Sequence, residues 1–150
     1  MLRGRLDILL VEDDANDVFF VHDAIAKSGG GHRLYKVKDG NEAIAYLKGQ
    51  GEYANREAHP VPNIVLTDLK MPGMDGFEFL QWLKDHPECG IIPVIVFCSS
   101  RHEADVRKAY QLGANAYIMK PRKLAELVDV LHSTYEFWSH CERPPMPKHC

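Results

Sequence analysis

Charged residues follow three short apolar runs in this sequence. Glu12, Asp13 and Asp14 follow the first of these runs, Asp68 ends another, and Lys120 comes directly after a third. Carboxylates that pack together repel one another, so such a cluster raises a pKa or recruits a cation. Oxygen ligands with an open, hydrated side suit magnesium. Lys120 would add a fixed positive charge on the far side of the cluster.

A carboxylate beside a magnesium ion and a lysine is chemically suited to accept a phosphoryl group. The carboxylate attacks phosphorus, while the metal and the ammonium group neutralise the phosphoryl oxygens. Little beyond positioning and charge is needed. The alternative is that these acids are solvated residues at strand ends, where turns favour Asp. That alternative suffices for any single acid, whereas charged residues at three separate strand ends together favour a site.

Apolar runs of strand length alternate with segments of helical period, a pattern typical of a wound α/β sheet. Strands are expected at residues 6–11, 33–38, 64–68, 93–98 and 116–119. Helices are expected at residues 16–27, 41–48, 76–86, 102–112 and 123–140. This order predicts a five-stranded parallel sheet flanked by five helices, flavodoxin-like and doubly wound, with strand order 2-1-3-4-5. The first and third strands are then neighbours, so their acids should converge at the carboxyl edge.

Length and composition suit a single domain. Of 150 residues, 45% are hydrophobic and 26% are charged, as in an ordinary globular protein. We expect one domain over residues 1–141, ending in an extended helix, and a Pro-containing mobile tail over residues 142–150. The net charge of −3 argues against a surface for nucleic acid or anionic lipid. The lack of an apolar run of roughly 20 residues, and of a signal-peptide pattern, predicts a cytoplasmic protein without a membrane span.

The cysteines are Cys89, Cys98, Cys141 and Cys150, and none of them forms a C-x-x-C pair. In a cytoplasmic setting, free thiols are the expected state. The two His-Cys dipeptides near the end of the sequence match no common zinc spacing, so a zinc site is disfavoured.

Four segments of the sequence resemble the response-regulator receiver domain of two-component signalling. They are ILLVEDD at 8–14, IVLTDLKMPGMDG at 64–76, PVIVFCSS at 93–100 and GANAYIMKP at 113–121. They occur in the order and at the spacing of that family, and they extend over nearly the whole chain. The details DANDVFF and YEFW resemble the small stand-alone regulators that are paired with bacterial phytochrome kinases.

The resemblance implies a role for each acid of the cluster. Asp68 would be the phosphorylation site and would take its phosphoryl group from the phosphohistidine of a sensor histidine kinase. Asp13 would be a direct magnesium ligand, and Glu12 would act largely through water. Lys70 would offer its backbone carbonyl to the metal. Asp14 is expected to be a helix N-cap or an exposed acid.

The resemblance also implies that Lys120 contacts the phosphoryl group and that the Lys120–Pro121 peptide bond is cis. A cis bond is accessible there because the trans preference of an X–Pro bond is only about 0.5–1 kcal/mol. A protein of this kind is a signalling protein and not an enzyme, although it assists its own phosphorylation and dephosphorylation.

One position departs from the family pattern. The family places Thr or Ser at the end of the fourth strand, where this chain has Cys98, followed by Ser99. A thiol is a weaker hydrogen-bond donor than a hydroxyl. The alternative for Cys98 is a small buried residue without a switch role. In that case either Ser99 takes over the role or the switch is blunted. Tyr117 occupies the aromatic switch position of the family, and the alternative for it is a partly buried strand residue.

Output is expected to occur through protein–protein contacts, since the sequence shows no DNA-binding helix-turn-helix. Tyr135, Phe137 and Trp138 in the last helix suit a homodimer interface. The alternative is that these aromatic residues pack onto the core of the domain itself. The expected partners are therefore a phytochrome-type sensor kinase and a second copy of the chain.

Two other functions use the same fold. A pseudo-receiver would bind partners without phosphorylation. Asp68, Asp13 and Lys120 argue against this function, whereas Cys98 argues for it. A flavodoxin-like redox carrier would need a phosphate-binding loop rich in Gly, Ser and Thr after the first strand. The sequence there is Glu-Asp-Asp, which would repel a flavin phosphate.

Overall fold

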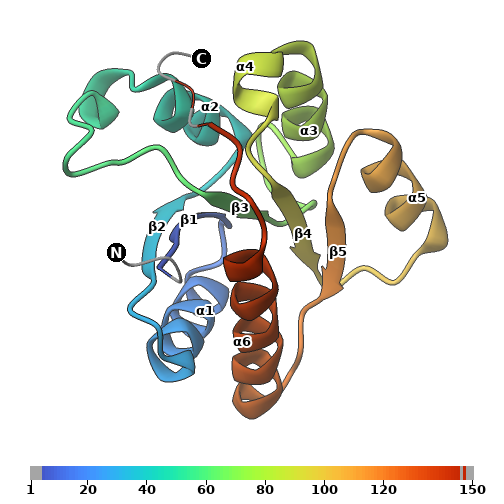
Figure 1. The fold of residues 1–150 in the computed structure, drawn as a ribbon. Helices are drawn as coiled ribbons and strands as arrows, with labels where there is room; N and C mark the ends of the chain where they lie inside the picture. Colours follow the sequence, from blue (N-terminus) through green and yellow to red (C-terminus); the bar gives the residue numbers. More distant parts are fainter. Residues whose placement is uncertain (1–4, 146, 148–150) are drawn as a thin grey trace.

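Five parallel strands form one sheet in the order β2-β1-β3-β4-β5 (Figure 1). The structure is a computed structural model that describes residues 5–145 and 147. The strands are β1 (Asp7–Val11), β2 (Arg33–Val37), β3 (Ile64–Thr67), β4 (Val94–Cys98) and β5 (Ala116–Met119). The strand order 2-1-3-4-5 predicted from the sequence is confirmed. Because β1 lies directly beside β3, with Val11 opposite Thr67, the residues that follow these two strands are neighbours.

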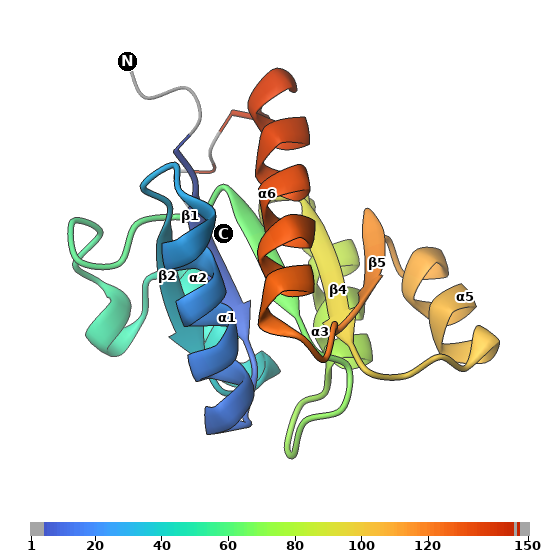
Figure 2. The ribbon, with the colours of Figure 1, turned by 90° about the horizontal axis from the view of Figure 1, so that it is seen from below.

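Helices cover both faces of the sheet (Figure 2). They are α1 (Ala15–Ser28), α2 (Gly40–Lys48), α3 (Gly76–Asp85), α4 (Pro87–Gly90), α5 (Glu103–Gln111) and α6 (Leu124–His140), with a 3₁₀ helix at Gly51–Tyr53. The five predicted helices are present with slightly different bounds, and α4 is an addition. This four-residue helix begins with Pro87, whose fixed φ suits the first turn of a helix, and it is too short to produce a periodic sequence pattern.

The two faces of the sheet are buried by different helices, as the side-chain alternation of the strands requires. On β1, Ile8 and Leu10 pack with residues of α1 and α6. Leu9 and Val11 of the same strand pack with residues of α2 and α3. All four side chains are buried, which explains why residues 8–11 form a continuous apolar run.

The end of α6 divides its aromatic residues between core and surface. Tyr135 is buried and its ring lies 4.0 Å from that of His32, centroid to centroid. Trp138 is half-buried against the same core, whereas Phe137 is 63% exposed. Of the three aromatic residues expected at an interface, Phe137 is therefore the one that faces solvent.

Residues 142–145 and 147 form no helix or strand, and the rest of the predicted tail lies outside the described residues. The expectation of free thiols holds for Cys98 and Cys141. It is wrong for Cys89, which is disulfide-bonded, because sequence spacing alone does not show which cysteines the fold brings together. Cys150 lies outside the described residues. Among the helices that the structure describes, none is long and apolar enough to cross a bilayer.

Gly76 is the residue at which the fold leaves no space for a side chain. A Cβ atom there would lie 2.2 Å from the carbonyl oxygen of Asp68 and 2.8 Å from Cα of Leu69. Both are backbone atoms, so a side chain would have to displace the loop that follows β3. We expect Gly76→Ala to lower the free energy of unfolding by about 3 kcal/mol, measured by urea denaturation.

The matched control is Gly31→Ala, where φ is +67° and nothing lies within 4 Å of the added Cβ. That substitution should cost only the left-handed backbone strain of roughly 1–2 kcal/mol. Equal losses in the two variants would contradict a steric role for Gly76.

Candidate functional site

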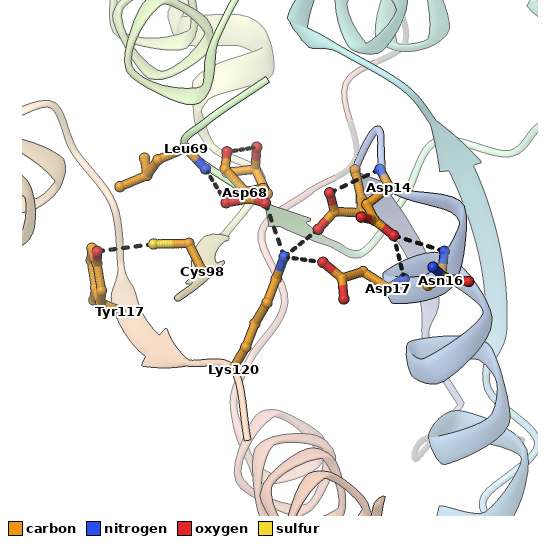
Figure 3. Close-up of polar contacts among 10 residues, drawn as sticks. Asp14, Asn16, Asp17, Asp68, Leu69, Cys98, Tyr117 and Lys120 are labelled. Atoms are coloured by element: carbon orange, nitrogen blue, oxygen red, sulfur yellow. Dashed lines mark hydrogen bonds and ion pairs between the residues drawn. The ribbon is translucent and has the colours of Figure 1, made fainter. Parts of the chain in front are cut away.

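Three carboxylates and one ammonium group meet at the carboxyl edge of the sheet (Figure 3). The Nζ atom of Lys120 donates hydrogen bonds to Asp68 Oδ2 and to Asp17 Oδ2, both at 2.9 Å, and to Glu12 Oε1. Glu12 follows β1, Asp68 follows β3 and Lys120 follows β5, whereas Asp17 lies in the first turn of α1. All three N–H donors of the lysine therefore have a carboxylate acceptor.

Burial and hydrogen bonds together set the charges of this cluster. Glu12 is 4% exposed and Asp68 is 9% exposed. Burial, and to a lesser extent the charge of Asp68, raises the pKa of Glu12 to about 7, although the hydrogen bond from Lys120 opposes this shift. Burial alone would lower the pKa of Lys120, but its hydrogen bonds to Glu12, Asp68 and Asp17 raise it. Lys120 is therefore a fixed cation at neutral pH.

The carboxylate of Asp68 is held in place on both of its oxygens. Oδ1 accepts a hydrogen bond from the backbone N–H of Leu69 at 2.7 Å, and Oδ2 accepts from Lys120. The backbone N–H of Asp68 donates to the carbonyl of Val11 at 3.0 Å, which ties the residue to β1. The side chain is thus oriented by the strands and aimed at the ammonium group.

Asp17 belongs to the cluster, and sequence reasoning missed it. One oxygen each of Glu12, Asp17 and Asp68 lie within 4.8 Å of one another, and Asp13 is exposed and is not one of these three. Asp14 caps α1, as expected, by accepting from the backbone N–H groups of Asn16 and Asp17 at 2.8 and 3.1 Å. The sequence signal for Asp17 is its spacing from the capping residue Asp14. A residue three positions after the cap lies about one helical turn further on, so its side chain again faces the edge of the sheet.

These three carboxylates are a suitable donor set for a divalent metal ion. They supply hard oxygen ligands from three different elements, and the single ammonium group leaves the cluster negatively charged when all three acids are ionised. Lys70 lies in the loop after Asp68, with an exposed side chain whose Nζ is 3.7 Å from Asp105 Oδ2. Its side chain therefore points to α5 and away from the carboxylates.

Cys98 and Tyr117 are in contact beside the cluster (Figure 3). The Sγ atom of Cys98 lies 3.0 Å from the Oη atom of Tyr117, and this hydroxyl donates to the carbonyl of Ser100 at 2.9 Å. Burial raises the pKa of the Cys98 thiol, so it is neutral and can donate to the tyrosine oxygen. Ser99 is exposed. Of the two candidates for the switch position, Cys98 is the one that contacts Tyr117.

A cleft of about 460 Å³ opens beside Lys120. Its walls come from α1, β4, β5 and the segments that follow these strands. The lining residues are Asn16, Asp17, Phe20, Val21, Phe97, Ser99, Arg101, Met119, Lys120, Pro121 and Arg122. The expectation of a cis bond between Lys120 and Pro121 is wrong, because none of the described peptide bonds is cis. The small free-energy difference between the two X–Pro isomers makes either one accessible.

The chain is similar to known signalling proteins over most of its length. A model of the response regulator receiver domain matches residues 8–132. Response regulator Rcp1 from Synechocystis is 40% identical over 131 residues, which are 87% of this chain and 87% of that protein.

Two solved structures share the fold. The phosphorylated cyanobacterial phytochrome response regulator RcpA is 37% identical, with a TM-score of 0.83 over 94% of this chain and 99% of that one. The Mn²⁺-bound form of Rcp1 is 38% identical, with a TM-score of 0.79 over 93% and 99% of the two chains. These similarities do not favour the redox-carrier or pseudo-receiver alternatives. With its sheet order and its cluster of acids and lysine, this chain belongs to the response regulator receiver family.

Proposed function

We propose that this chain is a single-domain response regulator that accepts a phosphoryl group on Asp68 from the phosphohistidine of a sensor histidine kinase. The observation that carries the proposal is the buried Asp68 carboxylate, which is fixed by Leu69 and lies 2.9 Å from the charged Lys120. Such a carboxylate is held in one orientation, and the ammonium group of Lys120 balances its negative charge. Receiver proteins of this family are signalling proteins and not classical enzymes.

In the proposed transfer, an Asp68 carboxylate oxygen attacks phosphorus and forms an O–P bond while the N–P bond to the kinase imidazole breaks. The imidazole leaves with the electron pair of that bond. Lys120 exchanges its bond to Asp68 for a bond to a phosphoryl oxygen, which it reaches from the same position beside the carboxylate. Magnesium, when bound, would neutralise phosphoryl charge. For the self-catalysed dephosphorylation, we propose that a water molecule attacks phosphorus while the P–O bond to Asp68 breaks and Asp68 leaves as a carboxylate, with Lys120 pairing with the phosphoryl oxygens.

For the metal, we propose Asp68 and Asp13 as direct ligands, Glu12 as a ligand largely through water, and the backbone carbonyl of Lys70. The support is the similarity to a regulator whose Mn²⁺-bound form is known, together with the gathering of Glu12 and Asp68. Magnesium is the proposed ion because carboxylate and carbonyl oxygens are hard ligands and the edge of the sheet is open to water.

The proposed kinase is of the phytochrome type, since the similar protein RcpA is a phytochrome response regulator. The proposal places the chain in the cytoplasm and its output in contacts with proteins, including a second copy of itself. Phe137, the exposed aromatic residue near the end of α6, is the residue that we propose for the homodimer contact. Neither nucleic acid nor a membrane is part of the proposal.

The test is incubation of the protein with acetyl phosphate, a small phosphodonor, followed by intact-mass measurement. With magnesium present we expect the mass to increase by one phosphoryl group, and with EDTA in place of magnesium we expect no increase. If no adduct forms at any magnesium or donor concentration, the chain is a phosphorylation-independent interaction module.

We also propose that Cys98 weakens the coupling between phosphorylation and conformational change. Its thiol contacts Tyr117, but a thiol is a weaker donor than the hydroxyl that the family usually places there. Cys98→Thr should therefore strengthen the response to phosphorylation. We expect phosphorylation to shift the switch equilibrium up to roughly tenfold further than in wild type. The Tyr117 NMR signal or the dimer fraction measures that shift. Tyr117→Phe identifies the signal, and equal responses in wild type and Cys98→Thr would refute the idea.

A further inference from the structure

Asp17 differs from the other two acids that hold Lys120. Glu12 and Asp68 follow strands and are buried, whereas Asp17 projects from the first turn of α1 and its side chain is 41% exposed. Its Oδ2 atom nevertheless lies 2.9 Å from the Nζ atom of Lys120, whose side chain is only 11% exposed. Asp17 is therefore the solvent-facing partner of a largely buried ammonium group.

The position of Asp17 is fixed by the local structure of α1. The Asp14 carboxylate accepts from the backbone N–H of Asp17, so the helix start determines where the side chain of Asp17 projects. Asp17 and Lys120 also line the same cleft, together with Ser99, Arg101 and Arg122. The pair thus stands where the buried carboxylates meet the cleft. Figure 3 shows the ammonium group of Lys120 between Asp68 and Asp17.

In the proposed function, two of the three partners of Lys120 have a second task. Asp68 accepts the phosphoryl group, and Glu12 serves the metal. Asp17 lies in the same cluster but is not in the proposed ligand set, so its hydrogen bond to Lys120 is the one that can persist when the other two are given up. Without it, a flexible four-carbon side chain would be free to leave the site and would lose the orientation on which a charge clamp depends.

We propose that Asp17 is a positioning residue that keeps the ammonium group of Lys120 at the mouth of the site, beside the cleft, while Glu12 and Asp68 are engaged. The proposal rests on the proposed phosphoryl-acceptor function. Two other roles are possible for an acid in this place. As a direct metal ligand, Asp17 would contribute to magnesium affinity. As a first-turn acid of α1, it would contribute only to helix stability.

The first measurement is independent of phosphorylation. In protein labelled with ¹⁵N-lysine, the side-chain ammonium signal of Lys120, assigned with Lys120→Gln, should shift in Asp17→Asn. The shift should be larger with saturating magnesium than without it. Asp23→Asn is the matched control, since Asp23 is a half-exposed acid of the same helix, paired with Lys27, and should leave the signal unchanged. No shift of the Lys120 signal in magnesium-loaded Asp17→Asn would overturn the proposal.

The second measurement is a double-mutant cycle on the rate of phosphorylation by acetyl phosphate at saturating magnesium. Asp17→Asn should slow the reaction roughly tenfold or more in the wild-type background. In the Lys120→Gln background it should change the rate by less than about twofold, because Asp17 acts through Lys120. Asp17→Glu should recover much of the loss, since it restores a carboxylate at the same position.

Magnesium affinity, measured by calorimetry, separates the competing roles. Asp17→Asn should bind magnesium within about threefold of wild type, and a loss greater than about tenfold would show that Asp17 is a ligand instead. Equal slowing by Asp17→Asn in both lysine backgrounds would also contradict the proposal. If the wild-type protein accepts no phosphoryl group, the proposed function fails, and the ammonium signal alone then decides whether Asp17 holds Lys120.

Discussion

Replacing Asp68 by Asn is expected to reduce magnesium-dependent phosphorylation by acetyl phosphate to background. An amide has nearly the shape of the carboxylate, and its oxygen can still accept from the backbone N–H of Leu69. It lacks the nucleophilic oxygen that forms the O–P bond. The substitution therefore removes the reaction without removing the local hydrogen bond. The measurement is the phosphorylated fraction, by intact mass, over a time course in which wild type reaches its plateau.

The control for this prediction is Asp85→Asn, the same chemical change at an exposed acid at the end of α3. It should be phosphorylated like wild type. Urea denaturation should show that Asp68→Asn is folded, since a folded protein is needed for the comparison. Phosphorylation of Asp68→Asn at the wild-type rate would mean that a different residue is the acceptor.

Replacing Lys120 by Gln is expected to change two properties in opposite directions. Phosphorylation should slow by roughly 10²–10³-fold, because a preorganised positive charge is lost from the side of the phosphoryl group. Magnesium affinity should rise by about tenfold, because the ammonium group neutralises the same Glu12 and Asp68 carboxylates that would hold the metal. An ammonium group and a metal ion compete for those oxygens.

Calorimetry with magnesium and the time course of phosphorylation measure the two effects. Lys123→Gln is the matched control, since Lys123 is an exposed lysine that precedes α6 and makes no side-chain cap bond to it. It should leave both quantities near those of wild type. If Lys120→Gln weakens both magnesium binding and phosphorylation, Lys120 maintains the shape of the site and does not compete with the metal.

The sheet and the meeting of Glu12, Asp68 and Lys120 follow from the sequence alone. Each of these residues comes directly after an apolar run, and the carboxyl ends of parallel strands lie at one edge of the sheet. The order of the strands then places β1 beside β3. A residue that directly follows a parallel strand can therefore be placed at the carboxyl edge of the sheet from its position in the sequence.

The part that sequence reasoning missed depends on turns and rotamers. Asp13 and Asp17 are both acids near the end of β1, yet Asp13 is exposed and Asp17 reaches Lys120. The difference is set by the residue at which α1 begins, and Asp14 fixes that residue through its capping bonds. A change of one residue in the helix start would rotate a different side chain towards the lysine.

The contact between Cys98 and Tyr117 shows the same limit. Both residues can be identified from their places at the ends of their strands, but which way the tyrosine ring turns depends on how its neighbours pack. Here its hydroxyl lies between the Cys98 thiol and the Ser100 carbonyl, a pairing that no sequence period specifies. Likewise the burial of Tyr135 follows from its packing in the core between α1 and α6.

Reduction of the phosphorylated protein with borohydride identifies the acceptor residue itself, because an aspartyl phosphate is reduced to homoserine and an unmodified aspartate is not. Wild-type protein is treated with acetyl phosphate and magnesium, reduced, digested and sequenced by tandem mass spectrometry. We predict homoserine at position 68 and aspartate at positions 13, 14 and 17. Homoserine at any of those three positions, or aspartate at position 68 in protein that carries the phosphoryl group, would contradict the assignment of Asp68 as the acceptor.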